Sequence, residues 1–163
     1  MRLDGPYSYI ISLNNGAYSV SSEKGEPHFT DPATSRKPKL YLLFRDSVFI
    51  YIGVTKQPLG TRIRMGMQAD GKHGYHGYAW KSLKGQLSLK VWCLEAEKEC
   101  DVSKELETIE AEVVHLFRTV SGQWPSCQTE IHFHESEDFH RSAARQVLGE
   151  HVDRFVASRA SGG

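Results

Sequence analysis

The chain contains few cysteines and no long apolar run. Cys93, Cys100 and Cys127 are its three cysteines, and no two of them have the Cys-x-x-Cys spacing of a zinc or redox motif. An odd number of thiols argues against a disulfide framework, so we expect reduced cysteines in the core or in strands. No apolar stretch approaches the roughly 18 residues of a membrane span, and the N-terminus lacks the layout of a signal peptide. We therefore expect a soluble, cytoplasmic protein with no membrane partner.

The chain also lacks net charge, because 20 basic residues balance 20 acidic ones. A neutral protein does not have the overall basic character typical of nucleic-acid binding. The two signs are nevertheless separated along the chain. Residues 36–84 contain ten Lys or Arg against Asp46 and Asp70, whereas residues 85–163 contain eight Lys or Arg against fourteen acids. This distribution favours a phosphate-contacting face in the basic segment, with an ordinary, unevenly charged surface as the alternative.

Hydrophobic alternation and turn residues predict one α+β domain spanning residues 1–163. The expected strands are 7–13, 17–21, 39–45, 48–53 and 87–94, and the expected helices are 58–68, 78–83, 102–120 and 137–157. Residues 1–38 form an N-terminal hairpin and loop extension, 39–128 a core, 129–160 a C-terminal strand and helix, and 161–163 a tail. This order predicts an α/β sandwich with a small central mixed or antiparallel sheet flanked by helices.

Glu110 is a carboxylate at an apolar position of the expected 102–120 helix. At about 100° per residue it lies about 40° from Leu106 and close to Phe117 around the helix axis. A carboxylate on the buried side of a helix is costly unless it is paired or binds a cation. Glu110 is therefore a candidate metal ligand, and the alternative is a core-edge carboxylate paired with Arg62 or Arg64.

Two tyrosines and an arginine precede this glutamate. Tyr41 and Tyr51 lie on opposite arms of the hairpin that turns at Asp46-Ser47, and cross-strand pairing lets them reach the same face of the sheet. Arg62 follows on the next helix, where its guanidinium can reach back over the sheet and bind a phosphate through two hydrogen bonds. Taken alone, strand tyrosines are usually packing residues. A proton acceptor, a cation for the phosphate and a carboxylate for a metal are together what phosphodiester cleavage requires.

The segment that carries these residues resembles the GIY-YIG nuclease family. Tyr51-Ile52-Gly53 matches the second half of the family signature, and Lys39-Leu40-Tyr41 stands at the first half with its glycine and isoleucine replaced. The stretch from Gly53 to Arg62 is similar to the family's strand-to-helix turn. The resemblance covers about residues 39–128, roughly half of the chain.

This resemblance implies a metal-dependent DNA endonuclease, most simply one acting on double-stranded DNA. Glu110 would bind one Mg²⁺ or Mn²⁺, which suits a hard oxygen ligand and a phosphate substrate. Tyr41 would accept the proton of the attacking water, and Tyr51 would orient the water or the phosphate. Arg62 would neutralise the pentacovalent phosphate.

Lys56 and Arg64 are candidates for contacts with DNA phosphates, and an ordinary exposed lysine is the alternative for Lys56. No second domain for target recognition is evident in the sequence. The N-terminal hairpin and the loops 22–38 and 71–77 would therefore read the target, within one chain or across a homodimer. A compact nuclease of this kind suits a restriction enzyme or another defence or repair nuclease.

The chain departs from the family pattern at Gly66, where many members have a histidine four residues after the arginine. His73 or His76, in the glycine-rich loop, is the candidate replacement as a proton shuttle or phosphate contact. Gln128, after Pro125, stands where family members often have an asparagine that follows a proline.

Two alternatives belong to other functional classes. Gly66 and the altered first motif allow a catalytically inactive nucleic-acid-binding module with the same fold. His132 and His134, at i and i+2 on an expected strand, would project to one face and bind zinc or iron together with His140 and a nearby carboxylate. Such His-x-His pairs are also common at plain strand ends.

Overall fold

The computed structural model describes residues 1–96 and 100–161, and only the backbone of 155–160. Gly162 and Gly163, which end the expected tail, lie outside the described residues. The strands are β1 (Arg2–Asn14), β2 (Ala17–Ser22), β3 (Lys39–Arg45), β4 (Val48–Thr55) and β5 (Gly85–Glu95). The helices are α1 (Leu59–Gln68), the 3-10 turn η1 (Ala79–Ser82), α2 (Val102–Ser121) and α3 (Asp138–Ala160). Among the described residues, none of these helices has the length and apolar character needed to cross a membrane.

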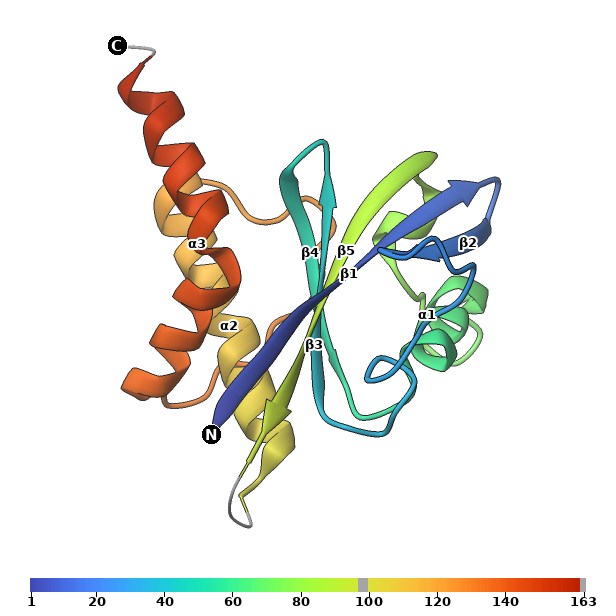
Figure 1. The fold of residues 1–163 in the computed structure, drawn as a ribbon, viewed down its shortest axis with the longest axis horizontal. Coiled ribbons are helices and arrows are strands. Elements are labelled where there is room, and N and C mark those ends of the chain that lie inside the picture. The colour runs from blue at the N-terminus through green and yellow to red at the C-terminus, as the bar shows by residue number, and fades with distance from the viewer. Residues whose placement is uncertain (97–99, 162–163) are drawn as a thin grey trace.

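All five strands form one sheet in the order β2-β1-β5-β3-β4. Each neighbouring pair is antiparallel, so the β1–β2 and β3–β4 hairpins lie on either side of β5 (Figure 1). The expected α+β sandwich and both hairpins are confirmed, and the sheet is antiparallel throughout rather than mixed. Asn15, Asp46 and Ser47 have positive φ angles at the two hairpin turns, as tight two-residue turns require.

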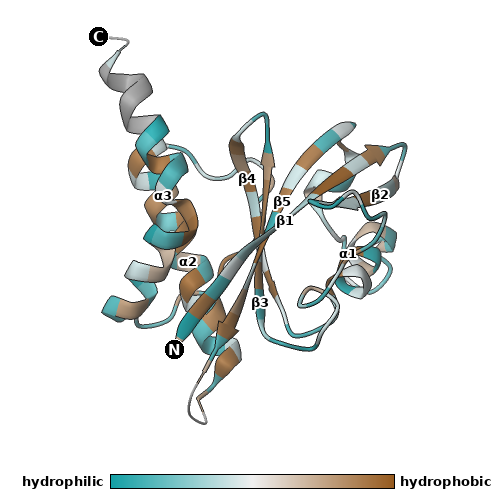
Figure 2. Ribbon diagram, in the orientation of Figure 1, coloured by the Kyte–Doolittle hydropathy of each residue, from teal (hydrophilic) through white to brown (hydrophobic). Residues whose placement is uncertain are grey.

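Helices and loops cover both faces of the sheet. In Figure 1, α2 and α3 lie on one side, and α1 lies on the other. Side chains of β3 alternate between the two cores, because Leu40 and Leu42 pack with α2 and α3 whereas Tyr41 and Leu43 pack with α1. Both faces of this strand are therefore buried, which explains its continuous apolar sequence. Figure 2 shows the apolar residues concentrated in the strands and in the helices that flank them.

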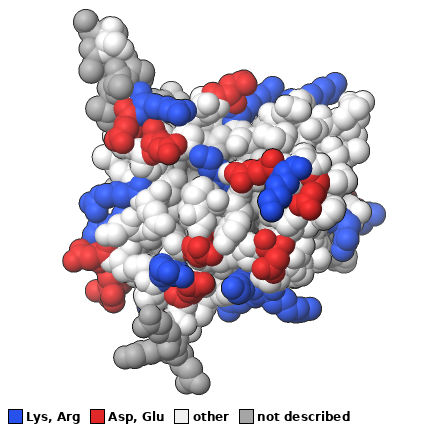
Figure 3. Space-filling model, in the orientation of Figure 1, with Lys and Arg blue, Asp and Glu red and all other residues white. Residues whose placement is uncertain are grey.

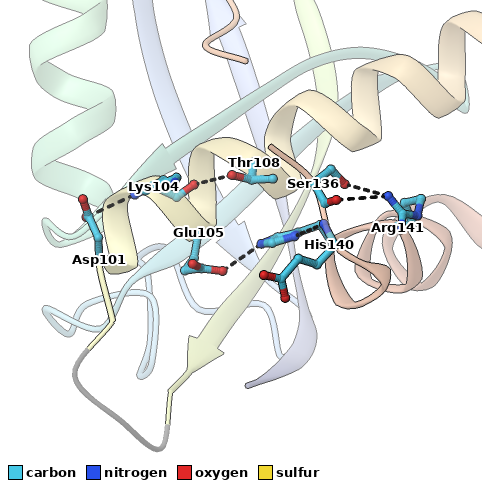
Figure 4. A network of polar contacts seen from close by, with 8 residues as sticks. Asp101, Lys104, Glu105, Thr108, Ser136, His140 and Arg141 are labelled. Atoms are coloured by element: carbon cyan, nitrogen blue, oxygen red, sulfur yellow. Dashed lines mark hydrogen bonds and ion pairs between the residues drawn. The ribbon is translucent and has the colours of Figure 1, made fainter. Parts of the chain in front are cut away.

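A polar network fixes α3 to α2 (Figure 4). The Asp101 carboxylate caps α2 by accepting a hydrogen bond from the Lys104 N–H at 3.3 Å. One turn on, Glu105 Oε2 lies 2.7 Å from His140 Nε2, while His140 Nδ1 accepts the Glu137 N–H at 2.9 Å. Because Nδ1 accepts, we assign the ring proton to Nε2, which donates to Glu105. The buried His140 thus satisfies a backbone donor where α3 begins and joins the two helices.

The strand expected near residues 129–137 is absent from this fully described segment, which is an irregular connection between α2 and α3. Just before it, the Cys127 N–H donates to the Ile50 carbonyl at 2.9 Å, and the Ile52 N–H donates to Gln128 Oε1 at 3.0 Å. The second bond uses a side-chain oxygen instead of a backbone carbonyl, so it does not continue as a β-ladder. The connection therefore covers the outer edge of β4 without extending the sheet.

Candidate active site

A pocket of about 240 Å³ opens at the β4 edge of the sheet. Parts of the chain from both faces of the sheet meet there. They are β4, α1, the glycine-rich connection after α1 (residues 69–78), α2 and the chain after α2. Its lining includes Tyr51, Arg62, Tyr78, Glu107, Glu110 and Glu130. Three of the four residues expected to carry the chemistry are therefore on its wall, and the fourth, Tyr41, lies directly behind it.

Three tyrosines gather over Gly53. The rings of Tyr41 and Tyr51 have their centroids 6.0 Å apart, and Tyr41 Oη lies 2.9 Å from Tyr78 Oη. A Cβ added at Gly53 would lie 2.5 Å from Tyr41 Oη and 2.9 Å from Tyr51 Oη. Glycine at this position therefore lets the two strand tyrosines converge on the same face, as their spacing in the sequence predicted.

Burial raises the pKa of all three phenols above the usual value. For Tyr41, which is fully buried, the pKa is raised well above 10 by burial and then by Tyr51, while Arg62 opposes the shift. Burial is also the main cause of the raised pKa of Tyr51 and of Tyr78. At neutral pH the three side chains are therefore uncharged, and they act in hydrogen bonds as both donors and acceptors.

Arg62 lies between two aromatic rings of the glycine-rich connection. Its Nη1 donates to Tyr75 Oη at 3.1 Å, and its Cζ lies 5.8 Å from the Tyr75 ring centroid and 5.6 Å from that of Tyr78. The Arg62 carbonyl also accepts a hydrogen bond from Tyr78 Oη at 3.3 Å. This half-buried guanidinium lines the pocket with a planar set of N–H donors that suits a phosphate.

Glu110 faces this pocket from α2 and is only 7% exposed. Within the described part of the chain, no donor forms a hydrogen bond or ion pair with its carboxylate, so the expected alternative of an ion pair with Arg62 or Arg64 is not found. The pKa of Glu110 is raised to about 8, mainly by burial and then by the nearby Glu107, while Arg62 opposes the shift and Glu130 adds a smaller increase. A buried carboxylate without a partner gains most from a bound cation.

The basic and acidic groups of the pocket lie on different sides of it. Arg62 and the phenol hydroxyls lie on the side of α1 and the sheet, whereas Glu107, Glu110 and Glu130 lie on the side of α2 and the chain that follows it. Among the described residues, no group of three or more His, Cys, Asp or Glu side chains is arranged to enclose a metal. A cation at Glu110 would therefore complete its shell with oxygen atoms of water and of a phosphate, which is the usual way that proteins bind Mg²⁺.

The other expected phosphate contacts lie outside this pocket. Lys56 is exposed in the turn between β4 and α1, and Arg64 is exposed on α1, where its charge acts on Tyr18 of β2. On the face seen in Figure 3, basic and acidic side chains are interspersed. The charge separation along the sequence therefore does not give that face a single sign.

Neither candidate histidine of the glycine-rich connection reaches the pocket. His73 and His76 are exposed, and the ring of His76 packs against Gly71 instead. Tyr78 occupies the space beside Gly66, where an added Cβ would come within 2.1 Å of its ring. The structure therefore does not bring His73 or His76 to the pocket, and the ring beside Gly66 is a phenol.

Gln128, the expected counterpart of the family asparagine, lies on the pocket wall. Its Oε1 accepts the Ile52 N–H at 3.0 Å, and its Nε2 donates to the Glu130 carbonyl at 3.2 Å. Both ends of the amide are thus engaged within the protein. The side chain joins the β4 wall of the pocket to the wall formed by the chain after α2.

The three histidines of the alternative metal site do not converge. Each is paired with a different carboxylate, at 3.4 Å for His132–Glu130 and 2.7 Å for both His134–Glu107 and His140–Glu105. His134 and His140 therefore tie the connection and α3 to α2, and within the described residues no zinc or iron site shared by the three histidines is found.

Sequence reasoning missed four ionisable residues of the pocket, namely Tyr75, Tyr78, Glu107 and Glu130. Glu107 could have been found, because it lies three residues before Glu110 and so shares its side of the helix. The two tyrosines belong to a Gly-Tyr-His-Gly-Tyr run without regular structure, which contains no periodic signal for the direction of a side chain.

No family model, curated protein or solved structure matches this chain. The resemblance to GIY-YIG nucleases therefore depends on the residues of the tyrosine, arginine and glutamate pattern and on their geometry.

Proposed function

We propose that this protein is a metal-dependent endonuclease that hydrolyses DNA phosphodiester bonds in the manner of the GIY-YIG family. The observation that carries the proposal is the buried, unpaired carboxylate of Glu110, which shares one pocket with Arg62 and three tyrosines. Packing alone gives no reason to bury an uncompensated carboxylate, which costs free energy. A substrate phosphate and a divalent cation would compensate Arg62 and Glu110 together.

Each wall of the pocket has a task in this reaction. Arg62 binds the scissile phosphate and neutralises the negative charge that develops on it. Tyr51, on the β4 wall, donates its hydroxyl hydrogen to a phosphate oxygen or orients the attacking water. Glu110 would hold Mg²⁺ or Mn²⁺, which supplies charge stabilisation at the leaving oxygen.

Tyr41 is the proton acceptor in this proposal, and its burial limits the fraction of molecules in which it can accept a proton. Its raised pKa means that few molecules hold a phenolate at neutral pH, although the nearby Arg62 favours that form. Below the pKa, the phenolate fraction grows tenfold for each pH unit. The cleavage rate is therefore expected to rise with pH through the neutral range.

Incubation of supercoiled plasmid with purified protein in Mg²⁺, in Mn²⁺ or in chelator tests the proposal. We expect cleavage that requires the metal and is lost in Glu110→Gln, while Glu112→Gln cleaves like the wild type. Glu112 is a matched control because it lies on the same helix, is half-buried and does not line the pocket. Cleavage that survives chelator or Glu110→Gln would exclude this mechanism. A discrete set of fragments would indicate restriction rather than repair, and the protein's mass in solution would test the homodimer.

One observation favours a second candidate, a cytoplasmic DNA-binding module without catalysis. Tyr41 is fully buried, uncharged at neutral pH and behind the wall rather than on it. This candidate predicts salt-sensitive DNA binding that needs no metal and produces no nicks, in the wild type as well as in Glu110→Gln. The plasmid experiment separates the two functions directly.

A further inference from the structure

We propose that Tyr78 is a positioning residue of the same site, which holds the Tyr41 hydroxyl and the Arg62 guanidinium in one arrangement. This inference rests on the proposed function, because the two residues that it positions are the expected proton acceptor and phosphate ligand. Tyr78 is 3% exposed, and it lies on the pocket wall between them.

The hydrogen bonds of Tyr78 orient the hydroxyl group of Tyr41. Tyr78 Oη lies 3.3 Å from the Arg62 carbonyl, which can only accept, so Tyr78 donates its single hydroxyl hydrogen there. The 2.9 Å contact between the two hydroxyls is then donated by Tyr41. In the phenol form this arrangement points the Tyr41 hydrogen at Tyr78. When Tyr41 has lost its proton, Tyr78 donates its hydroxyl hydrogen to the phenolate oxygen instead, and the remaining lone pairs of that oxygen accept the proton of the water.

The ring of Tyr78 supports Arg62 at the same time. The guanidinium Cζ lies 5.6 Å from the ring centroid, within the range of a cation–π contact. The same ring also stacks on Trp80, with the centroids 4.5 Å apart and an interplanar angle of 21°. Tyr78 is therefore held between the aromatic core and the cation that would bind the phosphate.

Two glycines make this placement possible. A Cβ at Gly66 would lie 2.1 Å from the Tyr78 ring, and a Cβ at Gly77 would lie 2.0 Å from the Gly66 carbonyl oxygen. Gly77 also has φ +73°, in the region that favours glycine. The connection after α1 can thus approach the helix backbone closely enough for Tyr78 to fill the place beside Gly66.

The hydroxyl group of Tyr78 distinguishes a positioning role of this residue from a role in core packing alone. A phenylalanine would fill the same volume without placing a polar group in the core, where an unbonded hydroxyl is costly. Both partners of this hydroxyl belong to residues of the proposed reaction. The variant Tyr78→Phe therefore removes the positioning hydrogen bonds and keeps the ring.

The test compares Tyr78→Phe with Tyr9→Phe. Tyr9 is an equally buried tyrosine outside the pocket, and its hydroxyl lies 3.0 Å from Thr30 Oγ1, so the control also loses one buried hydroxyl. Single-turnover cleavage is measured at saturating metal across a pH series, together with thermal unfolding. We expect Tyr78→Phe to cleave about 10- to 100-fold more slowly with an altered pH profile, because misplaced reacting groups lose rate on this scale. Tyr9→Phe should keep the wild-type rate and profile.

A second readout does not depend on cleavage. With all tyrosines labelled with ¹³C at Cζ, the chemical shift of Tyr41 should change in Tyr78→Phe in the absence of DNA. It should stay unchanged in Tyr9→Phe. An unchanged rate and pH profile in Tyr78→Phe would overturn the role, as would equal slowing in both variants. If the wild type does not cleave at all, the proposed function fails and the role fails with it. A wild type that cleaves beside an unaffected Tyr78→Phe refutes the role alone.

Discussion

Burying the carboxylate of Glu110 costs free energy, and under the proposed function a bound cation recovers that cost. The pKa of Glu110 in the folded protein is about 8, above its usual value of 4.5, so the folded state binds its proton more tightly than the unfolded state. Its contribution to stability is therefore complete below about pH 4.5 and is lost as the pH rises towards 8.

The first prediction follows from this linkage. In the wild type, raising the pH from 5 to 8 should lower the unfolding free energy by on the order of 4 kcal/mol, since a tenfold change in proton affinity is worth about 1.4 kcal/mol. Glu110→Gln should remove this pH dependence. Urea unfolding of both proteins without metal measures the difference. Mg²⁺ should raise the midpoint of the wild type at pH 8 and leave that of Glu110→Gln unchanged. A parallel pH dependence in the two proteins would contradict this account of Glu110.

Gly53 provides a second prediction at the scale of one residue. Gly53→Ala would bring a methyl group to 2.5 Å from Tyr41 Oη, so the phenols must move apart. We expect cleavage to fall about 100-fold, with a changed near-ultraviolet circular dichroism spectrum and a preserved far-ultraviolet spectrum. Gly60→Ala is the matched control, because its nearest neighbour would be Phe29 at 3.5 Å, an ordinary contact. Wild-type activity in Gly53→Ala would show that the tyrosines need not converge.

At the scale of elements, the packing of α3 against α2 depends on His140. His140→Ala removes the bond to Glu105 and leaves the Glu137 N–H without its acceptor. We expect a loss of about 2–3 kcal/mol in unfolding free energy, from a broken buried hydrogen bond and a lost helix cap. Equilibrium urea denaturation measures it. The control Arg141→Ala, next to it on the exposed side, should change stability by about 0.5 kcal/mol or less. Equal effects would mean that the two hydrogen bonds of His140 contribute little.

The elements that the sequence predicted well are those with a strong local signal. Asn14-Asn15-Gly16 and Asp46-Ser47 between apolar runs predicted both hairpins, and the position of Glu110 around its helix predicted its burial. These outcomes follow from turn chemistry and from the period of the helix, which act within a few residues.

What the sequence did not predict depends on contacts between distant segments. The strand expected around His132 and His134 is absent, since this segment forms no backbone pairing with β4 and His134 binds Glu107 on α2 instead. Tyr78 reaches the site because Gly66 and Gly77 let two stretches of backbone approach each other. Neither contact leaves a local pattern in the sequence, so the sequence indicated His73 and His76 rather than Tyr78 for this pocket.

For the whole molecule, a net charge of zero means that any attraction to DNA comes from local contacts. The proposed phosphate contacts are Lys56, Arg62 and Arg64. Each contact contributes about −0.9 to the slope of log K against log salt, so the slope should be about −3. Lys56→Ala should make it less steep by about 1, whereas Arg145→Ala, on exposed α3, should leave it unchanged. Fluorescence anisotropy of labelled duplex DNA in chelator measures these slopes. A slope near zero would exclude electrostatic binding to DNA phosphates.

The central strand of the sheet has a consequence for the synthesis of the protein. A ribosome completes both hairpins, with Tyr41, Tyr51 and Arg62, before it makes β5, the strand that pairs with β1 and β3. Glu110 emerges later still, on α2. Under the proposed function, a nascent or prematurely terminated chain would carry the groups that contact phosphate but not the carboxylate that binds the cation. The order of translation would then keep an unfinished chain from cutting the nucleic acid around it.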